Sequence, residues 1–155
     1  TIDIFKYKII EKVGEGGFGE VFKVKEKQSE TIYAAKVSLK SYDDESLLLI
    51  SREVNILSRI IHPCIVRFIG FSSTNLHHES KPVIITEFLS NGTLQDIISL
   101  ERRSLAKFEW NNTRKLINIY GIASSILYLH QHEILHRDLK PANVLINENL
   151  YQRIS

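Results

Sequence analysis

The chain has 155 residues, 43% of them hydrophobic and 25% charged, and its formal net charge is +2 at pH 7. This composition excludes an intrinsically disordered chain and argues against a general nucleic-acid binder, which needs a concentrated basic field. No apolar run reaches the roughly 18 residues of a membrane span, and we expect no signal peptide. Cys64 is the only cysteine, so we expect a reducing, cytoplasmic location and no internal disulfide.

The hydrophobic pattern predicts three strands, a helix and two further strands in the first half of the chain. Two runs over 9–13 and 20–25 flank a glycine cluster, and the second alternates with a period near two, which predicts a strand. A turn is predicted over 26–30, and a further strand over 31–39, where β-branched and apolar residues are frequent. Apolar residues spaced by three and four predict a helix over 41–61, which Ser41 and Asp44 would cap. His62 and Pro63 would end that helix. Apolar runs over 65–71 and 82–88 predict a strand pair joined by a polar loop.

Helices dominate the second half of the chain. Thr93 and Asp96 predict a capped helix over 94–100, directly after a turn at Asn91 and Gly92. A longer helix begins at residue 111 or 112, and its apolar residues share one face: Leu116, Ile119, Tyr120, Ala123, Ile126, Leu127 and His130. Runs over 144–146 and 150–154 predict a small hairpin. This order of elements indicates an α+β fold with two subregions that meet near residues 87–92.

A glycine cluster separates the first two predicted strands and contains Gly14, Gly16, Gly17 and Gly19. Glycine allows backbone N–H groups to approach a ligand closely. A P-loop requires Lys and Ser or Thr next, where Glu20 and Val21 stand, and a dinucleotide fingerprint requires a helix where a strand is predicted. Two interpretations remain: a glycine-rich hairpin that covers a triphosphate, and an ordinary glycine turn.

Two charged residues occupy positions where apolar side chains are expected. Glu53 lies three residues after Ile50, on the apolar stripe of its predicted helix, and Lys36 lies in the middle of an apolar strand. A buried carboxylate is costly unless it is paired, so the pattern predicts a Lys36–Glu53 ion pair that holds the ammonium toward phosphates. The alternative is that both side chains extend to solvent.

The polar loop from His136 to Asn143 is the strongest chemical signal in the chain. A carboxylate at Asp138 can accept a hydroxyl proton, and Lys140 can neutralise charge on a transferring phosphoryl group. The amide oxygen of Asn143 is a suitable ligand for Mg²⁺. Phosphoryl transfer requires mainly positioning and charge neutralisation, and this loop carries groups for both. The alternative is a solvated charged loop.

In this order, the glycine cluster, Lys36 after two alanines, Glu53, and the run from His136 to Asn143 resemble the signature set of the eukaryotic protein kinases. The resemblance implies a protein-kinase-like α+β fold. Its small lobe would hold a five-stranded antiparallel sheet with one helix, and its large lobe would be represented by the first helical part. The kinase domain would cover residues 1–155, with the small lobe at 1–86, the hinge at 87–92 and an incomplete large lobe at 93–155.

The resemblance also implies a role for each matching residue. Asp138 would be the catalytic base, Lys140 a contact to the γ-phosphate and Asn143 a Mg²⁺ ligand. Lys36 would bind the α- and β-phosphates of ATP and pair with Glu53. The residues implied to surround the nucleotide, including a gatekeeper at Thr86 and hinge contacts at Glu87 and Leu89, are Gly14, Glu15, Gly16, Gly17, Gly19, Val21, Ala34, Lys36, Thr86, Glu87, Leu89 and Leu145.

The implied activity is ATP-dependent phosphoryl transfer to Ser or Thr hydroxyls of protein substrates, with ATP and Mg²⁺ as cofactors. Lys140 resembles the Ser/Thr class, because tyrosine kinases usually carry Ala or Arg at that position. Segments 86–97 and 127–143 resemble the tyrosine-kinase-like group of Ser/Thr kinases. We expect neither nucleic acid nor a membrane span among the partners of this segment.

Two departures from the family pattern limit what the 155 residues would do by themselves. Tyr33 stands where the family usually has valine, and the family's Asp-Phe-Gly segment, which supplies a second Mg²⁺ ligand, is expected after Ser155. We therefore expect no appreciable phosphotransfer from this chain in isolation. The alternative function is a truncated, catalytically inactive kinase-like module that binds nucleotide or serves as an interaction surface. We also expect poor solubility, because the family's later helices would cover apolar surface on residues 116–129.

Overall fold

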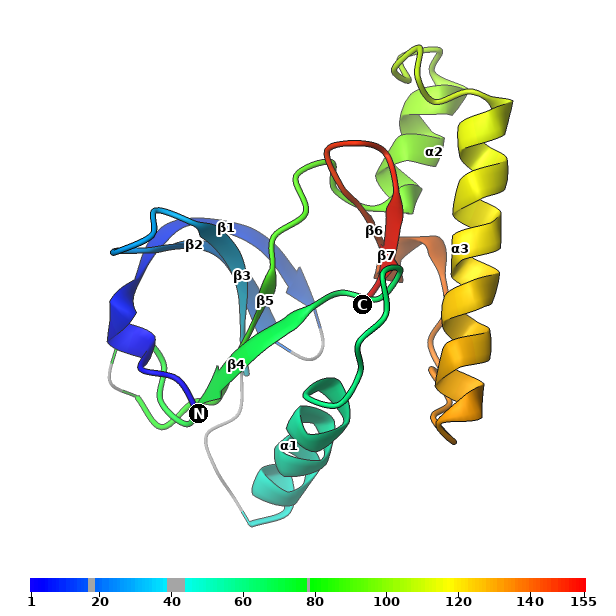
Figure 1. The fold of residues 1–155 in the computed structure, drawn as a ribbon. Coiled ribbons are helices and arrows are strands. Elements are labelled where there is room, and N and C mark those ends of the chain that lie inside the picture. The colour runs from blue at the N-terminus through cyan, green and yellow to red at the C-terminus, as the bar shows by residue number, and fades with distance from the viewer. Residues whose placement is uncertain (17–18, 39–43, 78) are drawn as a thin grey trace. The chain divides into compact units, whose positions relative to one another are not determined.

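The computed structural model describes residues 1–16, 19–38, 44–77 and 79–155, without the side chains of residues 44–49 and 53. The chain forms two compact units (Figure 1). Unit 1 contains Thr1–Ile60 and Arg67–Phe88, and unit 2 contains Ile61–Val66 and Leu89–Ser155. Each unit has its own hydrophobic core, so each is described by itself.

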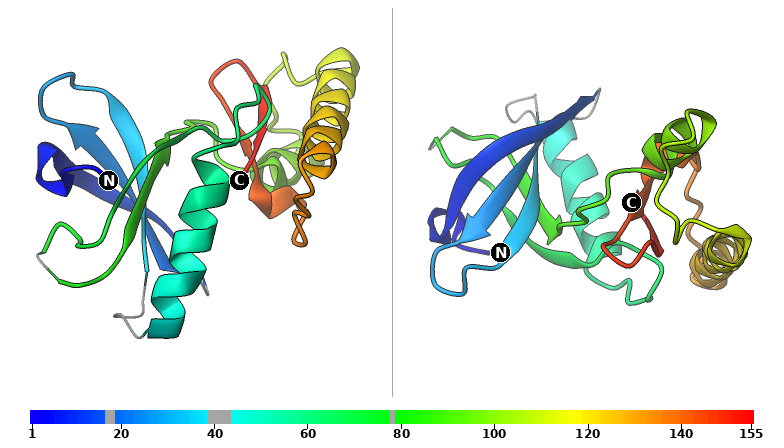
Figure 2. Two further views of the ribbon diagram at one scale, coloured as in Figure 1. Left: turned by 60° about the horizontal axis from the view of Figure 1, so that its bottom comes forward. Right: turned by 90° about the horizontal axis from the view of Figure 1, so that it is seen from above.

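Unit 1 is built on the predicted five-stranded antiparallel sheet. Its strands are β1 (Tyr7–Gly16), β2 (Gly19–Glu26), β3 (Ile32–Val37), β4 (Phe68–Ser72) and β5 (Val83–Glu87), in the spatial order β1-β2-β3-β5-β4. All neighbouring pairs are antiparallel, and the sheet is strongly twisted (Figure 2). The first two strands are longer than predicted, because their pairing continues through the glycines to Gly16 and Gly19.

The core of unit 1 lies on one face of this sheet. Alternate residues of the central strands point into it, including Val24, Ala35 and Ile85. The N-terminal segment covers the same face: a short 3-10 helix, η1 (Ile4–Lys6), buries Ile4 to 1% exposure. The backbone N–H of Ile2 donates to the carbonyl of Phe71 in β4 (2.8 Å), which ties this segment to the opposite edge of the sheet. The sequence pattern had indicated no element before residue 9.

The helix of unit 1, α1 (Asp44–Leu57), ends earlier than predicted. The prediction ran to residue 61, but the backbone N–H groups of Arg59 and Ile60 bond three residues back, to the carbonyls of Ile56 and Leu57, so the helix tightens into turns. Ile61 belongs to unit 2 and is 86% exposed, so its inclusion in the apolar stripe was wrong. The predicted capping pair of Ser41 and Asp44 lies outside the described residues and side chains.

Unit 2 contains α2 (Leu94–Arg102), α3 (Asn112–Gln131), the 3-10 helix η2 (Pro141–Asn143), and a two-stranded sheet of β6 (Val144–Ile146) and β7 (Gln152–Ile154). The predicted capping box is confirmed: the Thr93 hydroxyl accepts from the N–H of Asp96 (3.1 Å), and the Asp96 carboxylate accepts from the N–H of Thr93 (2.8 Å). Trp110 precedes α3 and is buried with Ile97, Ile146 and Leu150.

Helix α3 buries a narrow strip of mainly small and polar residues: Asn118, Gly121, Ser125 and Leu129. The predicted apolar face is the exposed one, with Leu116, Ile119, Tyr120 and Leu127 each more than half exposed. Within the described part of the chain, no helix is both long and apolar enough to cross a membrane. The exposed stripe is therefore an uncovered surface of unit 2 as described.

The apolar stripe of α3 generates a prediction about association. We expect the 155-residue chain to self-associate through it, and the double variant Leu116→Gln with Leu127→Gln to lower the aggregated fraction in sedimentation analysis. His130→Gln, a polar exchange at an exposed position of the same helix, is the matched control. A wild-type chain that remains a monodisperse monomer and melts cooperatively would contradict this expectation.

Gly19 has a conformational role that can be tested by substitution. Its φ is +145°, and an added Cβ would lie 2.1 Å from the carbonyl oxygen of Val37. We expect Gly19→Ala to lower the free energy of unfolding by at least about 2 kcal/mol in urea titrations. Gly14→Ala is the control, because its nearest contact would be Val21 at an ordinary 3.8 Å. Equal effects of the two substitutions would show that the close approach at Val37 carries no strain.

Candidate active site

The predicted phosphate-binding glycines lie on the hairpin of β1 and β2. Gly14 pairs with Val21, and Gly16 pairs with Gly19 at the end of the ladder. Gly17 lies outside the described residues. Glu15 contacts Lys12 (2.6 Å), and this contact lowers the pKa of the Glu15 carboxyl from its ordinary value. The structure thus brings Gly14, Glu15, Gly16 and Gly19 together on one hairpin.

A second group of predicted nucleotide residues shares one face of the sheet. Ala35 and Val37 point into the core, so Ala34 and Lys36 point to the opposite face of β3. Val21 of β2 is directly opposite Lys36, and Thr86 of β5 is directly opposite Ala34. Directly opposed residues in an antiparallel ladder lie on the same face. Val21, Ala34, Lys36 and Thr86 therefore form one cross-strand patch, which we call the sheet patch.

The structure describes only one of the two side chains in the predicted ion pair of Lys36 and Glu53. Lys36 is partly buried in the middle of β3, on the sheet patch. Glu53 lies within α1, but its side chain lies outside the described part of the chain, so the structure does not test the pairing with Lys36. The pair stays a prediction.

The residues predicted to contact the adenine divide between the two units. Glu87 ends β5 in unit 1, and its carboxylate accepts from the N–H of Arg67 (2.8 Å) while its own N–H donates to the Arg67 carbonyl (3.0 Å). Thr86 donates through its hydroxyl to the carbonyl of Glu87 (3.3 Å). Leu89 and Leu145 belong to unit 2, and Leu145 in β6 forms an isolated bridge with Thr93. Their shared role at a nucleotide stays a prediction.

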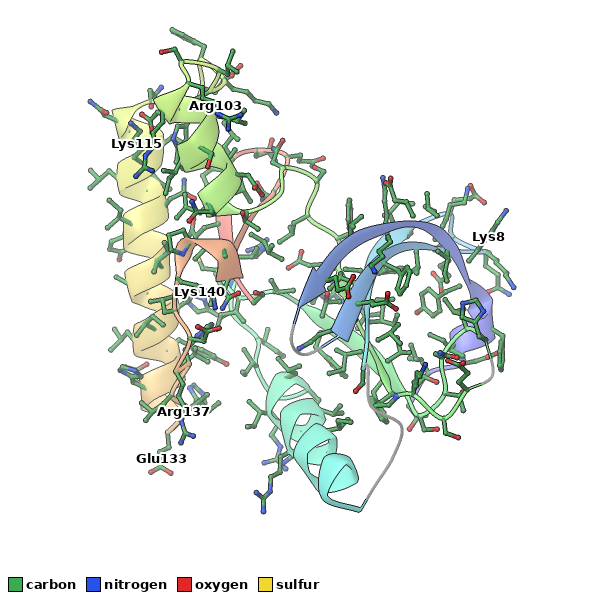
Figure 3. The ribbon with its side chains drawn as sticks, turned by 180° about the vertical axis from the view of Figure 1, so that it is seen from behind. Lys8, Arg103, Lys115, Glu133, Arg137 and Lys140 are labelled. Carbon is green, nitrogen blue, oxygen red and sulfur yellow. The ribbon has the colours of Figure 1, made fainter. Side chains whose placement is uncertain are left out.

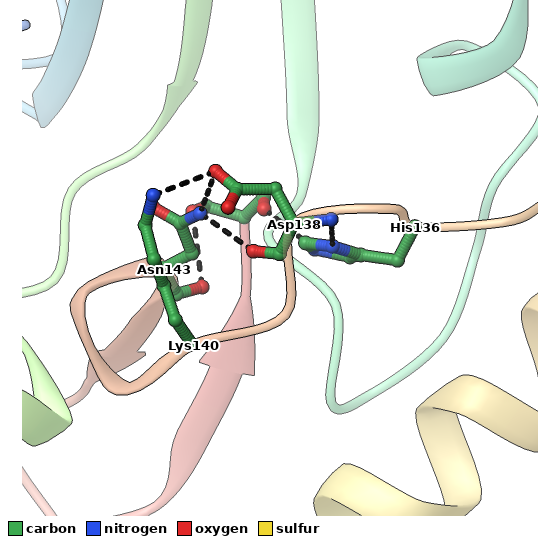
Figure 4. Close-up of polar contacts among 5 residues, drawn as sticks. His136, Asp138, Lys140 and Asn143 are labelled. Atoms are coloured by element: carbon green, nitrogen blue, oxygen red, sulfur yellow. Dashed lines mark hydrogen bonds and ion pairs between the residues drawn. The ribbon is translucent and has the colours of Figure 1, made fainter.

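The polar loop of unit 2 brings the three predicted catalytic and metal-binding groups together around Asp138 (Figure 4). The Lys140 ammonium donates to Oδ2 of Asp138 (2.9 Å), and the Asn143 amide Nδ2 donates to the same oxygen (2.8 Å) and to the Asp138 carbonyl (2.8 Å). These contacts, first that of Lys140 and then that of Asn143, lower the pKa of Asp138 from its ordinary value of 3.8. We call these three residues the Asp138 cluster.

The Asp138 cluster leaves oxygen atoms available for a reacting group and a cation. Among the described residues, no hydrogen bond is formed by Oδ1 of Asp138 or by Oδ1 of Asn143. An exposed carboxylate can accept a proton, and an amide oxygen suits a hard cation such as Mg²⁺. The described residues contain no group of three or more His, Cys, Asp or Glu side chains placed to hold a metal. The donor set therefore fits Mg²⁺ through Asn143 as one ligand of a site that needs further oxygens.

A backbone network that the sequence did not reveal supports the Asp138 cluster from the side of β7. His136 bonds through Nε2 to the carbonyl of Ser155 (3.0 Å), and the Ser155 N–H donates to the carbonyl of Asn143 (3.0 Å). The Asp138 N–H donates to the His136 carbonyl (2.9 Å) across Arg137, whose φ of +63° makes the tight bend. Figure 3 shows Arg137 and Lys140 on this segment between α3 and β6. The Ser155 hydroxyl donates to the same Asn143 carbonyl (3.1 Å). Ser155 lies 12 residues after Asn143, so spacing along the chain carries no signal for its contribution.

The lowered pKa of Asp138 has a testable origin in Lys140. We expect Lys140→Ala to raise the pKa of Asp138 toward 3.8 in a carboxyl NMR titration. Because the folded pKa is lowered, the Lys140 contact contributes stability above the ordinary pKa, and that contribution is lost as the pH falls through the lowered value. Lys115→Ala is the control: it removes the partner of Glu101, so the pKa of Glu101 should rise and that of Asp138 should not. An unchanged Asp138 titration in Lys140→Ala would contradict the assignment.

Comparison with known proteins agrees with the resemblance of the sequence motifs to the protein kinases. The family model described as the protein kinase domain matches residues 7–155. The chain is 35% identical over its whole length to a mimivirus protein named as a serine/threonine-protein kinase/receptor, of which it covers 9%. It is 34% identical over 97% of its length to human NUAK family SNF1-like kinase 1, and 31% identical over 97% to cysteine-rich receptor-like protein kinase 5 of Arabidopsis thaliana.

The chain spans 22% of the length of each of these last two relatives. The matched residues include the glycine hairpin, the sheet patch and the Asp138 cluster, so the similarity covers the elements described above. The chain belongs to the protein kinase family.

Proposed function

We propose that the protein transfers a phosphoryl group from ATP to Ser or Thr hydroxyls of protein substrates. The observation that carries this proposal is the Asp138 cluster, in which one carboxylate accepts hydrogen bonds from an ammonium and from an amide N–H. Protein kinases use ATP and, in general, Mg²⁺. Within this family we assign residues 1–86 to the small lobe, 87–92 to the hinge and 93–155 to the first part of the large lobe.

In the proposed mechanism, each described residue has one task. The N–H groups of the glycine hairpin and the Lys36 ammonium hold the phosphates, and Val21 and Ala34 contact the adenine beside the small side chain of Thr86. Asp138 accepts the hydroxyl proton of the substrate through Oδ1, because Oδ2 is engaged by Lys140 and Asn143. The Lys140 ammonium then leaves Asp138 and contacts the phosphoryl group that is transferred. Asn143 would hold Mg²⁺ through its amide oxygen, and the bound ion would neutralise phosphate charge.

Lys140 and the relatives' names favour Ser and Thr over Tyr as the acceptors. The similar proteins named above include a serine/threonine kinase/receptor, although human dual specificity testis-specific protein kinase 2 is also 34% identical over 93% of the chain. We propose a place in the tyrosine-kinase-like group on the basis of segments 86–97 and 127–143.

The role of Asp138 is testable by removing its charge. The assay uses the longest protein that the gene of this chain encodes. In it, Asp138→Asn should lower the rate of phosphoryl transfer to a Ser/Thr peptide library by at least about 100-fold. ATP binding, measured separately by titration, should change far less, because Asp138 contacts the acceptor side of the reaction. Glu148→Gln, an acid-to-amide exchange at an exposed turn, is the control.

The outcomes distinguish the proposed function from its alternative. Equal activity in Asp138→Asn and the wild type would contradict the assignment of the base. A wild-type product that binds ATP but transfers no phosphoryl group to any peptide would favour a nucleotide-binding, catalytically inactive module instead.

A further inference from the structure

The hairpin of β1 and β2 carries three charged side chains that form one ion cluster. The Lys12 ammonium lies 2.6 Å from Oε2 of Glu15 and 2.6 Å from Oε1 of Glu20, so one cation bridges two carboxylates on neighbouring strands. Hydrogen bonds to these carboxylates, first that to Glu15 and then that to Glu20, raise the pKa of Lys12, so the ammonium stays charged at neutral pH. We call these three residues the Lys12 cluster.

A β-bulge in β1 brings the Lys12 cluster together. The register of β1 against β2 shifts between Lys12 and Gly14, which leaves Val13 as an extra residue on β1. In a regular strand, residues three apart point to opposite faces, so the side chains of Lys12 and Glu15 would be separated by the sheet. The bulge turns Glu15 to the face of Lys12, and the observed ion pair depends on this change of face.

The Lys12 cluster lies on the face of the hairpin opposite to the sheet patch. Glu20 directly precedes Val21, whose side chain belongs to the sheet patch, so alternation turns Glu20 to the other face. Glu15 is directly opposite Glu20, and Lys12 is directly opposite Phe22, which packs against the core of unit 1. The three charged side chains therefore act on a nucleotide beside the sheet patch through the conformation of the hairpin, and not by contact.

The end of the hairpin depends on the Lys12 ammonium. Without it, Glu15 and Glu20 would be like charges directly opposite one another, which destabilises an antiparallel pair. The next pair, Gly16 with Gly19, has no side chains whose packing could compensate. Exposed ion pairs contribute little to the free energy of unfolding of a whole domain. The effect of the Lys12 cluster is therefore local: it keeps the last pairs of the ladder formed.

We propose that Lys12 is a positioning residue for the nucleotide. By neutralising Glu15 and Glu20, it holds the glycine end of the hairpin in the paired conformation that presents backbone N–H groups to the phosphates. This role rests on the proposed function, because that function supplies the nucleotide. The order of the hairpin end itself requires no ligand. Lys12 sets the affinity for ATP and takes no part in the chemical step.

The test measures ATP affinity in the longest protein that the gene of this chain encodes. Lys12→Met should raise the Kd of ATP about three- to tenfold at low salt and leave kcat nearly unchanged. Lys12→Arg keeps the cation and should bind ATP as the wild type does. In Lys12→Met, the further exchanges Glu15→Gln and Glu20→Gln remove the repulsion and should restore the affinity. Lys25→Met is the matched control, because it removes a cation from β2 that pairs with Glu30, away from the glycines.

Two further readouts separate this role from a general loss of stability. Salt screens exposed charges, so the Kd of Lys12→Met divided by that of the wild type should fall toward one at about 1 M NaCl, where the Debye length is about 3 Å. Without ATP, amide hydrogen exchange in residues 14–16 and 19–21 should be faster in Lys12→Met than in the wild type. Exchange in β3 should be the same in both proteins.

The outcomes that contradict the proposal are specific. An unchanged Kd in Lys12→Met would overturn it, as would a weakened affinity that the two glutamine exchanges do not restore. A Kd ratio that is independent of salt would overturn it as well. A wild-type protein that binds no ATP would overturn the proposed function, and with it the role of Lys12 at the nucleotide. The exchange measurement needs no nucleotide, so it would still show whether the Lys12 cluster orders the hairpin.

Discussion

The antiparallel register of β2, β3 and β5 is the constraint on which the candidate nucleotide site depends. Side chains alternate along a strand, so a shift of β3 by one residue would turn Lys36 into the core and Ala35 out of it. The observed register instead pairs Lys36 with Val21 and Ala34 with Thr86. The fully buried Ala35 and the buried Val37 fix this choice, because moving a lysine to their face would bury an ammonium. The hydrophobic core of unit 1 thereby decides which residues form the sheet patch.

A comparable relation holds in unit 2, where packing around the hairpin positions a reactive carboxylate. Val144, Ile146 and Ile154 are buried in the short sheet of β6 and β7, which fixes the backbone directly after the polar loop. The Ser155 N–H then donates to the Asn143 carbonyl, and Nε2 of His136 bonds to the Ser155 carbonyl. Asp138 itself stays half exposed, so its orientation comes from Lys140, Asn143 and the bend at Arg137, and not from burial.

Local signals in the sequence predicted what local interactions determine. The strands of unit 1 follow from alternation in one run and from apolar and β-branched residues in the others. The start of α2 follows from Thr93 and Asp96, whose bonds span three residues. The grouping of Asp138, Lys140 and Asn143 was equally predictable from the sequence, because the loop is short. Packing between residues far apart in the sequence could not be predicted from such local signals. Gly121 of α3 is buried because the hairpin approaches it closely, and a glycine carries no hydrophobic signal. The end of α1 is set by a change from i−4 to i−3 bonding that periodicity does not register.

The N-terminal segment has a practical consequence for where the domain begins. The match to the family model starts at residue 7, yet Ile4 is among the most completely buried side chains of unit 1, and the methyl groups of Ile2 occupy the space above Gly70. A protein expressed from the first matched residue onward would lack both isoleucines, and the core face of the sheet would be exposed to water along β4. For this chain, the folding unit therefore begins ahead of the first residue that the family model matches.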